Sequence, residues 1–177
     1  MKLGKIQNWH GVSALVVGLL LCESNANAGE ASGSVLKIEG AVKQRVQLTL
    51  GDLRAMERVT VKAANRDGAE QEFEGVRLWD LVEKARPFGT KEHKELVNAC
   101  VIVKARDGYQ AVFALAELAP SIGEKTVILA DRSDGKSLTV TDGLLKIVVP
   151  GEKMHSRWVR QVTDLEIVSL LSKSQTK

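Results

Sequence analysis

The stretch that decides the fold runs from Leu144 to Val162 and reads L-L-K-I-V-V-P-G-E-K-M-H-S-R-W-V-R-Q-V. An apolar, strand-like segment leads into Pro150-Gly151, and apolar alternation resumes after a charged loop. That loop contains Glu152, Lys153, His155, Arg157, Trp158 and Arg160. A plain hairpin needs only about two to five turn residues, and it does not require so many charged and aromatic side chains. The loop is therefore either a ligand-facing edge or a solvated turn that happens to be basic.

The chain around this stretch has the pattern of a β-rich domain with few helices. Val76–Arg86 has apolar residues at helical spacing and is stopped by Pro87, and Gly51–Met56 and Ala114–Leu118 predict short helical turns. Short apolar or alternating runs predict strands at Val35–Glu39, Val42–Leu50, Val59–Ala63, Glu70–Glu74, Val97–Ala105, Tyr109–Phe113, Lys125–Asp131, Leu138–Val140, Leu144–Val149 and Trp158–Val168. The expected fold is α+β, with mixed, mainly antiparallel β-sheets and a few short helices.

The first 28 residues have the three regions of a secretory signal peptide. Lys2 and Lys5 precede the apolar run Val12–Leu21, and Ala26-Asn27-Ala28 provides a small-x-small cleavage site. The alternative is a buried N-terminal helix; the run is too short for a transmembrane helix, which needs about 20 apolar residues. We expect cleavage after Ala28 and a periplasmic or secreted protein with no transmembrane segment after cleavage.

Removal of 28 of the 177 residues leaves 149, enough for one domain with a real core. The expected division is a signal peptide at 1–28, a flexible N-terminus at 29–41, a domain at 42–170 and a tail at 171–177. The net charge of the whole chain is +3, and no run of five basic residues occurs, so nucleic acid is not an expected partner. Cys100 is the one cysteine after residue 28, and its apolar neighbours favour burial.

Generic catalytic motifs are absent from the sequence. There is no G-x-G-x-x-G or Walker A loop for nucleotide phosphates and no G-x-S-x-G elbow for a nucleophilic serine. His93 and His155 are far apart in the sequence and have no cysteine or second histidine near them, so no zinc site is indicated.

Four polar turns interrupt the expected strands: Asn65-Arg66, Arg106–Tyr109, Asp131–Gly135 and His155–Trp158. If the sheet brings them to one rim, they form a polar pocket with cations for an anionic ligand. The alternative is that these turns are polar for backbone reasons, since Asx-Gly pairs favour turns.

Four segments in order resemble one known family. They are F-E-G-V-R-L-W-D-L-V at Phe73–Val82, D-G-Y-Q-A-V-F-A-L-A-E-L at Asp107–Leu118, V-I-L-A-D-R-S-D-G-K-S-L at Val127–Leu138, and the opening stretch Leu144–Val162. Together they resemble the sulfite-oxidase-type molybdopterin-binding domain, in a compact exported form, over roughly residues 42–168. The final part of the fourth segment, V-P-G-…-W-V-R, is the most unusual part of the pattern.

The resemblance implies a domain that buries a molybdopterin cofactor and couples oxygen-atom transfer to electron transfer. Carried onto this sequence, it implies a cofactor-binding set of Asn65, Arg66, Asp107, Tyr109, His155, Arg157 and Trp158. A periplasmic redox or accessory protein is the expected partner.

The sequence departs from the family pattern at two places. Catalytic members have a metal-binding cysteine shortly before the Asn-Arg pair, but here Val61-Lys62-Ala63-Ala64 precedes Asn65-Arg66. Lys62 or Ala63 cannot replace a soft thiolate ligand, and Cys100 is the only other candidate. The second departure is Met154, where an arginine for the substrate is expected.

Three hypotheses remain open from the sequence. The chain is an exported molybdopterin-dependent oxidoreductase, or a non-catalytic relative that binds another small anionic ligand or a protein partner. The third is a secreted β-rich adaptor without a pocket.

Overall fold

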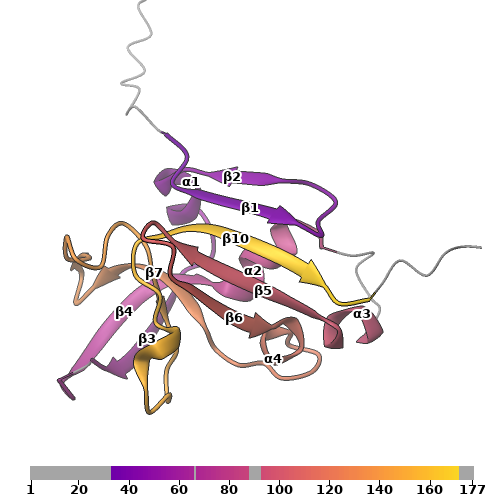
Figure 1. Cartoon of the computed structure of the whole chain (residues 1–177). Helices are drawn as coiled ribbons and strands as arrows, with labels where there is room; N and C mark the ends of the chain where they lie inside the picture. Colours follow the sequence, from indigo (N-terminus) through magenta and orange to yellow (C-terminus); the bar gives the residue numbers. More distant parts are fainter. Residues whose placement is uncertain (1–32, 66, 88–92, 172–177) are drawn as a thin grey trace, which may run out of the picture. The chain divides into compact units, whose positions relative to one another are not determined.

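The computed structural model describes residues 33–65, 67–87 and 93–171 (Figure 1). The expected signal peptide, Arg66 and residues 172–177 lie outside this part of the chain. Among the described residues, no helix has the length and apolar character needed to cross a membrane.

The first sheet has five strands in the order β2-β1-β10-β5-β6. β1 pairs with β10 in parallel, whereas the other neighbours are antiparallel, so the sheet is mixed as the sequence predicted. The strands are β1 (Leu36–Gly40), β2 (Val46–Leu48), β5 (Ala99–Ala105), β6 (Gln110–Ala114) and β10 (Val162–Ser169).

β1 lies in the segment 29–41, which we expected to be a flexible N-terminus. Leu36 and Ile38 are fully buried, and they alternate with exposed Lys37 and Glu39. Because β1 pairs with both β2 and β10, residues 36–40 form an interior strand of the sheet.

The second sheet has the order β3-β4-β7-β8, and β9 pairs with β7. All of its pairs are antiparallel. The strands are β3 (Val59–Ala64), β4 (Glu70–Arg77), β7 (Ile128–Ser133), β8 (Lys136–Ser137) and β9 (Lys146–Val148).

The pairing of β4 with β7 contains a bulge, because the register shifts between Glu74 and Gly75. A side-chain Cβ on Gly75 would lie 2.2 Å from the carbonyl oxygen of Leu129. Glycine is therefore required where the two backbones approach most closely.

Four short helices and one 3-10 turn connect the described strands: α1 (Leu50–Arg54), α2 (Leu78–Lys84), α3 (His93–Val97), α4 (Leu115–Leu118) and η1 (His155–Arg157). α1 begins at a capping box, in which Asp52 N donates to Thr49 Oγ1 at 3.1 Å and Thr49 N donates to Asp52 Oδ2 at 2.8 Å. These reciprocal bonds explain how a five-residue helix holds its N-terminus.

Several predicted element boundaries were wrong. The helix expected at Val76–Arg86 begins at Leu78, because β4 continues to Arg77 alongside β7. α3 includes Val97, where we expected a strand to begin, and β5 begins only at Ala99. The strand expected at Leu144–Val149 is reduced to β9, and Leu138–Val140 forms no strand.

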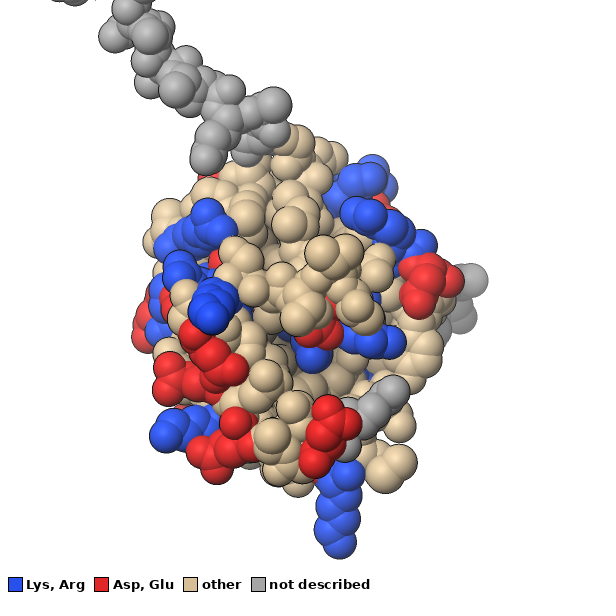
Figure 2. All heavy atoms as spheres, turned by 90° about the vertical axis from the view of Figure 1, so that its left-hand side faces the viewer, with Lys and Arg blue, Asp and Glu red and all other residues tan. Residues whose placement is uncertain are grey.

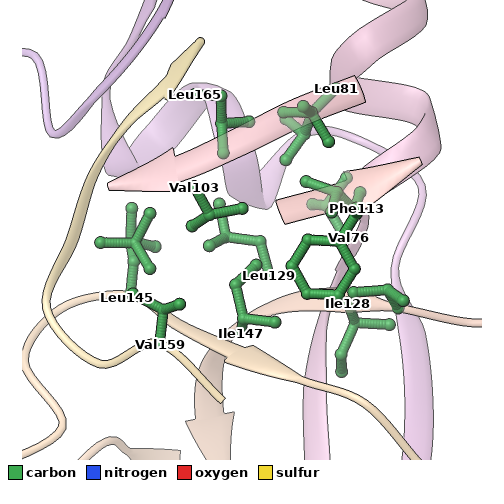
Figure 3. Close-up of a cluster of buried hydrophobic side chains, with 14 of the residues drawn as sticks. Val76, Leu81, Val103, Phe113, Ile128, Leu129, Leu145, Ile147, Val159 and Leu165 are labelled. Carbon is green, nitrogen blue, oxygen red and sulfur yellow. The ribbon is translucent and has the colours of Figure 1, made fainter. Parts of the chain in front are cut away.

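One hydrophobic core joins the two sheets and the helices. In Figure 3, Val103, Phe113 and Leu165 from the first sheet lie with Ile128, Leu129 and Ile147 from the second, and Leu81 of α2 lies beside them. These residues are nearly or completely inaccessible to solvent. The shared core fixes the sheets to each other and so fixes the positions of the turns that leave them.

Candidate functional site

An open pocket of about 750 Å³ lies where three connections meet: the β3–β4 turn, the β5–β6 turn and the segment between β9 and β10. The described residues that line it are Ala64, Asn65, Gly68, Asp107, Tyr109, Glu152, Lys153, Met154, His155, Ser156, Trp158 and Arg160. Five predicted site residues are therefore together: Asn65, Asp107, Tyr109, His155 and Trp158. Arg66 lies outside the described residues.

The β3–β4 turn supplies the first wall. Asn65 Oδ1 accepts hydrogen bonds from the backbone N–H groups of Asp67 at 2.9 Å and Ala69 at 3.0 Å. Gly68 has φ +83°, a conformation that favours glycine. Asn65 thus shapes its own turn, whatever else it contacts.

The β5–β6 turn supplies the second wall. Asp107 Oδ1 accepts a hydrogen bond from Tyr109 N at 3.0 Å. Tyr109 Oη donates to the carbonyl oxygen of Ser156 at 2.5 Å, so this side chain ties the second wall to the third.

The third wall contains the 3-10 turn of the opening stretch. A 3-10 helix has about three residues per turn, so His155 and Trp158 lie on one face. Their ring centroids are 4.1 Å apart. Trp158 is 8% exposed, its Nε1 donates to Val149 O at 3.2 Å, and its ring meets Phe73 edge-on at 5.7 Å. Trp158 therefore belongs to both the core and the pocket.

Arg157 lies two positions after His155 and is not among the residues that line the pocket. Its guanidinium bonds to Glu152, to Glu117 Oε1 at 2.9 Å and to Val112 O at 3.4 Å, and it stacks on Phe113 at 4.5 Å from the ring centroid. The structure thus does not bring Arg157 together with the other predicted site residues.

Among the described residues that line the pocket, two have acidic side chains and three have basic or imidazole side chains. Asp107 is engaged with its own turn, and Glu152 is paired with Arg157 and Lys125. Desolvation opposes ionisation of Glu152, but hydrogen bonds from Arg157 and Lys125 outweigh it and lower the pKa of that carboxyl. Lys153, His155 and Arg160 form no ion pair with any described residue.

Basic and acidic side chains are interspersed over the face seen in Figure 2, with no single basic surface. Among the described residues that line the pocket, Glu152 is neutralised by its cationic partners, and the two unpaired cations Lys153 and Arg160 outnumber the one unpaired acid, Asp107, so the net unpaired charge is positive.

Seven described residues that line the pocket were not in the predicted site: Ala64, Gly68, Glu152, Lys153, Met154, Ser156 and Arg160. The sequence signal for most of them was their place in the opening loop. The sequence could not show which side chains of that loop face the pocket, because a 3-10 turn of three residues is too short to give a periodic pattern.

Cys100 lies at the end of β5 away from this pocket. Ala105, at the other end of the strand, pairs with Val162 beside the β5–β6 turn. Five residues at about 3.4 Å each separate the two positions by roughly 17 Å. Desolvation, with a smaller effect of Glu166, raises the pKa of the Cys100 thiol. No cluster of metal-ligating residues occurs in the described part of the chain.

The two sheets, with the pocket at the ends of two hairpins, form a mixed α+β domain of the kind that the four sequence segments predict. The chain matches the family described as oxidoreductase molybdopterin binding domain over residues 29–176, and it belongs to that family. This match confirms the resemblance seen in the four sequence segments.

The chain is similar to the sulfane dehydrogenase SoxCD from Paracoccus pantotrophus, with a TM-score of 0.61 and 21% identity. The match covers 80% of this chain and 40% of that chain, so the present sequence spans well under half of the larger protein. At this identity the similarity confirms the fold. A comparison with curated proteins found no match.

The residues present do not fit a molybdenum ion held by a protein thiolate. No cysteine is among the described residues that line the pocket, and their histidine, amide and amine donors are not the soft ligands that replace a thiolate. The cations and aromatic rings instead fit an anionic organic group.

Proposed function

We propose that this domain is a non-catalytic member of its family that binds a small organic anion without a protein-bound metal. The observation that carries the proposal is the balance of charge among the described residues that line the pocket: Lys153 and Arg160 have no ion-pair partner, Glu152 is paired with Lys125 and Arg157, and Asp107 is the one acid without a cationic partner.

The aromatic groups favour a ligand with a planar ring over a simple inorganic anion. The adjacent, mutually tilted rings of His155 and Trp158 and the ring of Tyr109 offer apolar contact beside the cations. A ring-bearing carboxylate or phosphate would use both kinds of contact.

Isothermal titration calorimetry of the chain lacking residues 1–28 tests this proposal, with pterin-6-carboxylate and inorganic phosphate as probes. We expect saturable binding of pterin-6-carboxylate and weaker binding of phosphate. The variant Lys153→Ala/Arg160→Ala should bind at least about 10-fold more weakly, because a charge-assisted hydrogen bond contributes about 1.5–3 kcal/mol.

Lys62→Ala is the matched control, since Lys62 is exposed on β3 and does not line the pocket. Its affinity should equal that of the wild type. Absence of binding in the wild type, or equal losses in both variants, would reject the proposal.

A second candidate is retention of the molybdopterin cofactor, which the family match over residues 29–176 favours. Elemental analysis and pterin extraction of protein from a molybdenum-replete host distinguish the two. Non-catalytic binding predicts no molybdenum; near-stoichiometric molybdenum with oxygen-atom transfer would establish the second candidate instead.

Export is part of the proposal. The charged start, the apolar run Val12–Leu21 and Ala26-Asn27-Ala28 support cleavage after Ala28. Mass spectrometry of the protein recovered from a periplasmic fraction should give an N-terminus at Gly29. A chain that retains Met1 and stays in the cytoplasm would contradict export.

A further inference from the structure

A four-residue ion cluster lies directly behind the third wall of the pocket. It consists of Glu117 on α4, Lys125 before β7, Glu152 in the pocket wall and Arg157 in η1. Lys125 Nζ is 3.1 Å from Glu152 Oε1 and 3.6 Å from Glu117 Oε2. The cluster therefore joins the wall to two segments outside the pocket.

Within the cluster, Glu152 has the position that matters for a ligand. It lines the pocket, yet a single oxygen, Oε1, receives both Lys125 Nζ and two nitrogens of Arg157. The carboxylate is thereby held against Lys125 and Arg157, which are not among the residues that line the pocket. Without them, a negative charge would stand at the wall beside Lys153 and His155.

Arg157 is well placed to hold that carboxylate. Its guanidinium is fixed by Glu117 and by stacking on Phe113, which is fully buried. A guanidinium retains its charge at all physiological pH values and forms several directed hydrogen bonds at once. Its position is thus set by α4 and β6, independently of any ligand.

We propose that Arg157 is a positioning residue that keeps the pocket attractive to anions by pairing with Glu152, without touching the ligand itself. The inference rests on the proposed function. It differs from the role expected from the sequence, in which Arg157 contacted the anion directly.

The distinguishing experiment is a double-mutant cycle with pterin-6-carboxylate in the same calorimetric assay. Arg157→Met should weaken binding about 5-fold, since an unpaired charge a few ångströms from an anion at a wet surface costs on the order of 1 kcal/mol. Arg157→Met/Glu152→Gln should return to within about 2-fold of the wild type, because the uncompensated charge is gone. Direct contact between Arg157 and the ligand predicts no such rescue, and that result would overturn the inference.

Two further variants separate charge from folding. Arg157→Lys keeps the charge and should stay within about 3-fold of the wild type. Lys125→Met removes the other cation on Glu152 while the Phe113 stacking remains, so it should give a smaller loss that Glu152→Gln also rescues. If Arg157→Met fails to fold, Lys125→Met replaces it in the double-mutant cycle. Arg45→Met is the control for loss of one positive charge, since Arg45 is exposed and forms no ion pair with a described residue.

A readout without ligand keeps this inference distinct from the proposed function. Tyr109 is the only tyrosine of the chain and lines the pocket. An anionic and a cationic nitroxide each enhance the relaxation of its ring protons, and the ratio of the two enhancements reports the local electrostatic potential. Arg157→Met should shift that ratio toward the cationic probe, and Glu152→Gln should reverse the shift.

If pterin-6-carboxylate fails to bind but the nitroxide ratios change and reverse in this way, the proposed function fails and the role of Arg157 stands. If binding is normal but neither the cycle nor the ratios show rescue, the role of Arg157 fails and the proposed function stands.

Discussion

Asn65 shows how a residue expected to bind a ligand can first serve its own backbone. Its Oδ1 accepts two backbone hydrogen bonds within the β3–β4 turn. Asn65→Ala should lower the free energy of unfolding by about 1 kcal/mol, since both acceptor contacts are lost at a partly exposed site. Urea denaturation measures this change. Asn65→Asp keeps the acceptor and should lose less; equal stability of Asn65→Ala and the wild type would refute the turn-forming role.

Cys100 is predicted to react slowly despite its partial exposure. Desolvation, and secondarily Glu166, raise the pKa of the thiol, so less of the nucleophilic thiolate is present near neutral pH. Alkylation by iodoacetamide at pH 8 should be at least about 3-fold slower than that of free cysteine and should reach the free rate in urea. Glu166→Gln should accelerate it modestly. A native rate equal to that of free cysteine would contradict the prediction.

At the scale of the elements, the β4–β7 bulge depends on Gly75. A Cβ there would lie 2.2 Å from Leu129 O and 2.6 Å from Ala130 Cα, both backbone atoms that cannot move without breaking the pairing. Gly75→Ala should therefore cost about 3 kcal/mol or more of stability in urea denaturation. Gly51→Ala, in α1 with no close contact, should change stability by less than about 1 kcal/mol. Similar costs for the two variants would argue against the clash.

The ion cluster behind the pocket links η1 to α4 and should make stability depend on pH. The folded state has a lowered pKa for Glu152, because hydrogen bonds from Arg157 and Lys125 outweigh its desolvation. Its contribution is therefore complete above the unfolded carboxyl pKa, about 4.3, and is lost as pH falls through the lower folded value. Urea midpoints measured from pH 6 to pH 3 should fall less steeply for Glu152→Gln than for the wild type. Identical slopes would show that the cluster does not contribute.

The sequence predicted most of these elements but not where some of them end. Local alternation was sufficient for β3 and β6, in which exposed residues alternate with buried or half-buried ones. The strand expected at Glu70–Glu74 continues to Arg77, because β7 pairs with β4 across the bulge. β9 is short for a similar reason: β7 pairs with only three residues of the strand expected at Leu144–Val149. No local signal in that segment shows which three residues will pair.

At the scale of the whole molecule, the pocket depends on distances that sequence spacing does not contain. Asn65, Asp107 and His155 are in separate connections, and the two sheets bring those connections together. The polarity of the turns predicted a rim, but it could not separate His155, which faces the pocket, from Arg157, which pairs with Glu152 and Glu117. That difference comes from the 3-10 turn and from Phe113 on β6.

Because one core joins both sheets, the two sheets should unfold as a single cooperative unit. Phe113 is fully buried among side chains from both sheets (Figure 3). Phe113→Ala should cost about 3–5 kcal/mol and shift the urea midpoints seen by tryptophan fluorescence and by far-ultraviolet circular dichroism equally. Val112→Ala, the neighbouring residue on β6 with 52% exposure, should change stability by less than about 0.5 kcal/mol. If the two probes separate in Phe113→Ala, the sheets unfold independently and the pocket between their connections opens before the core is lost.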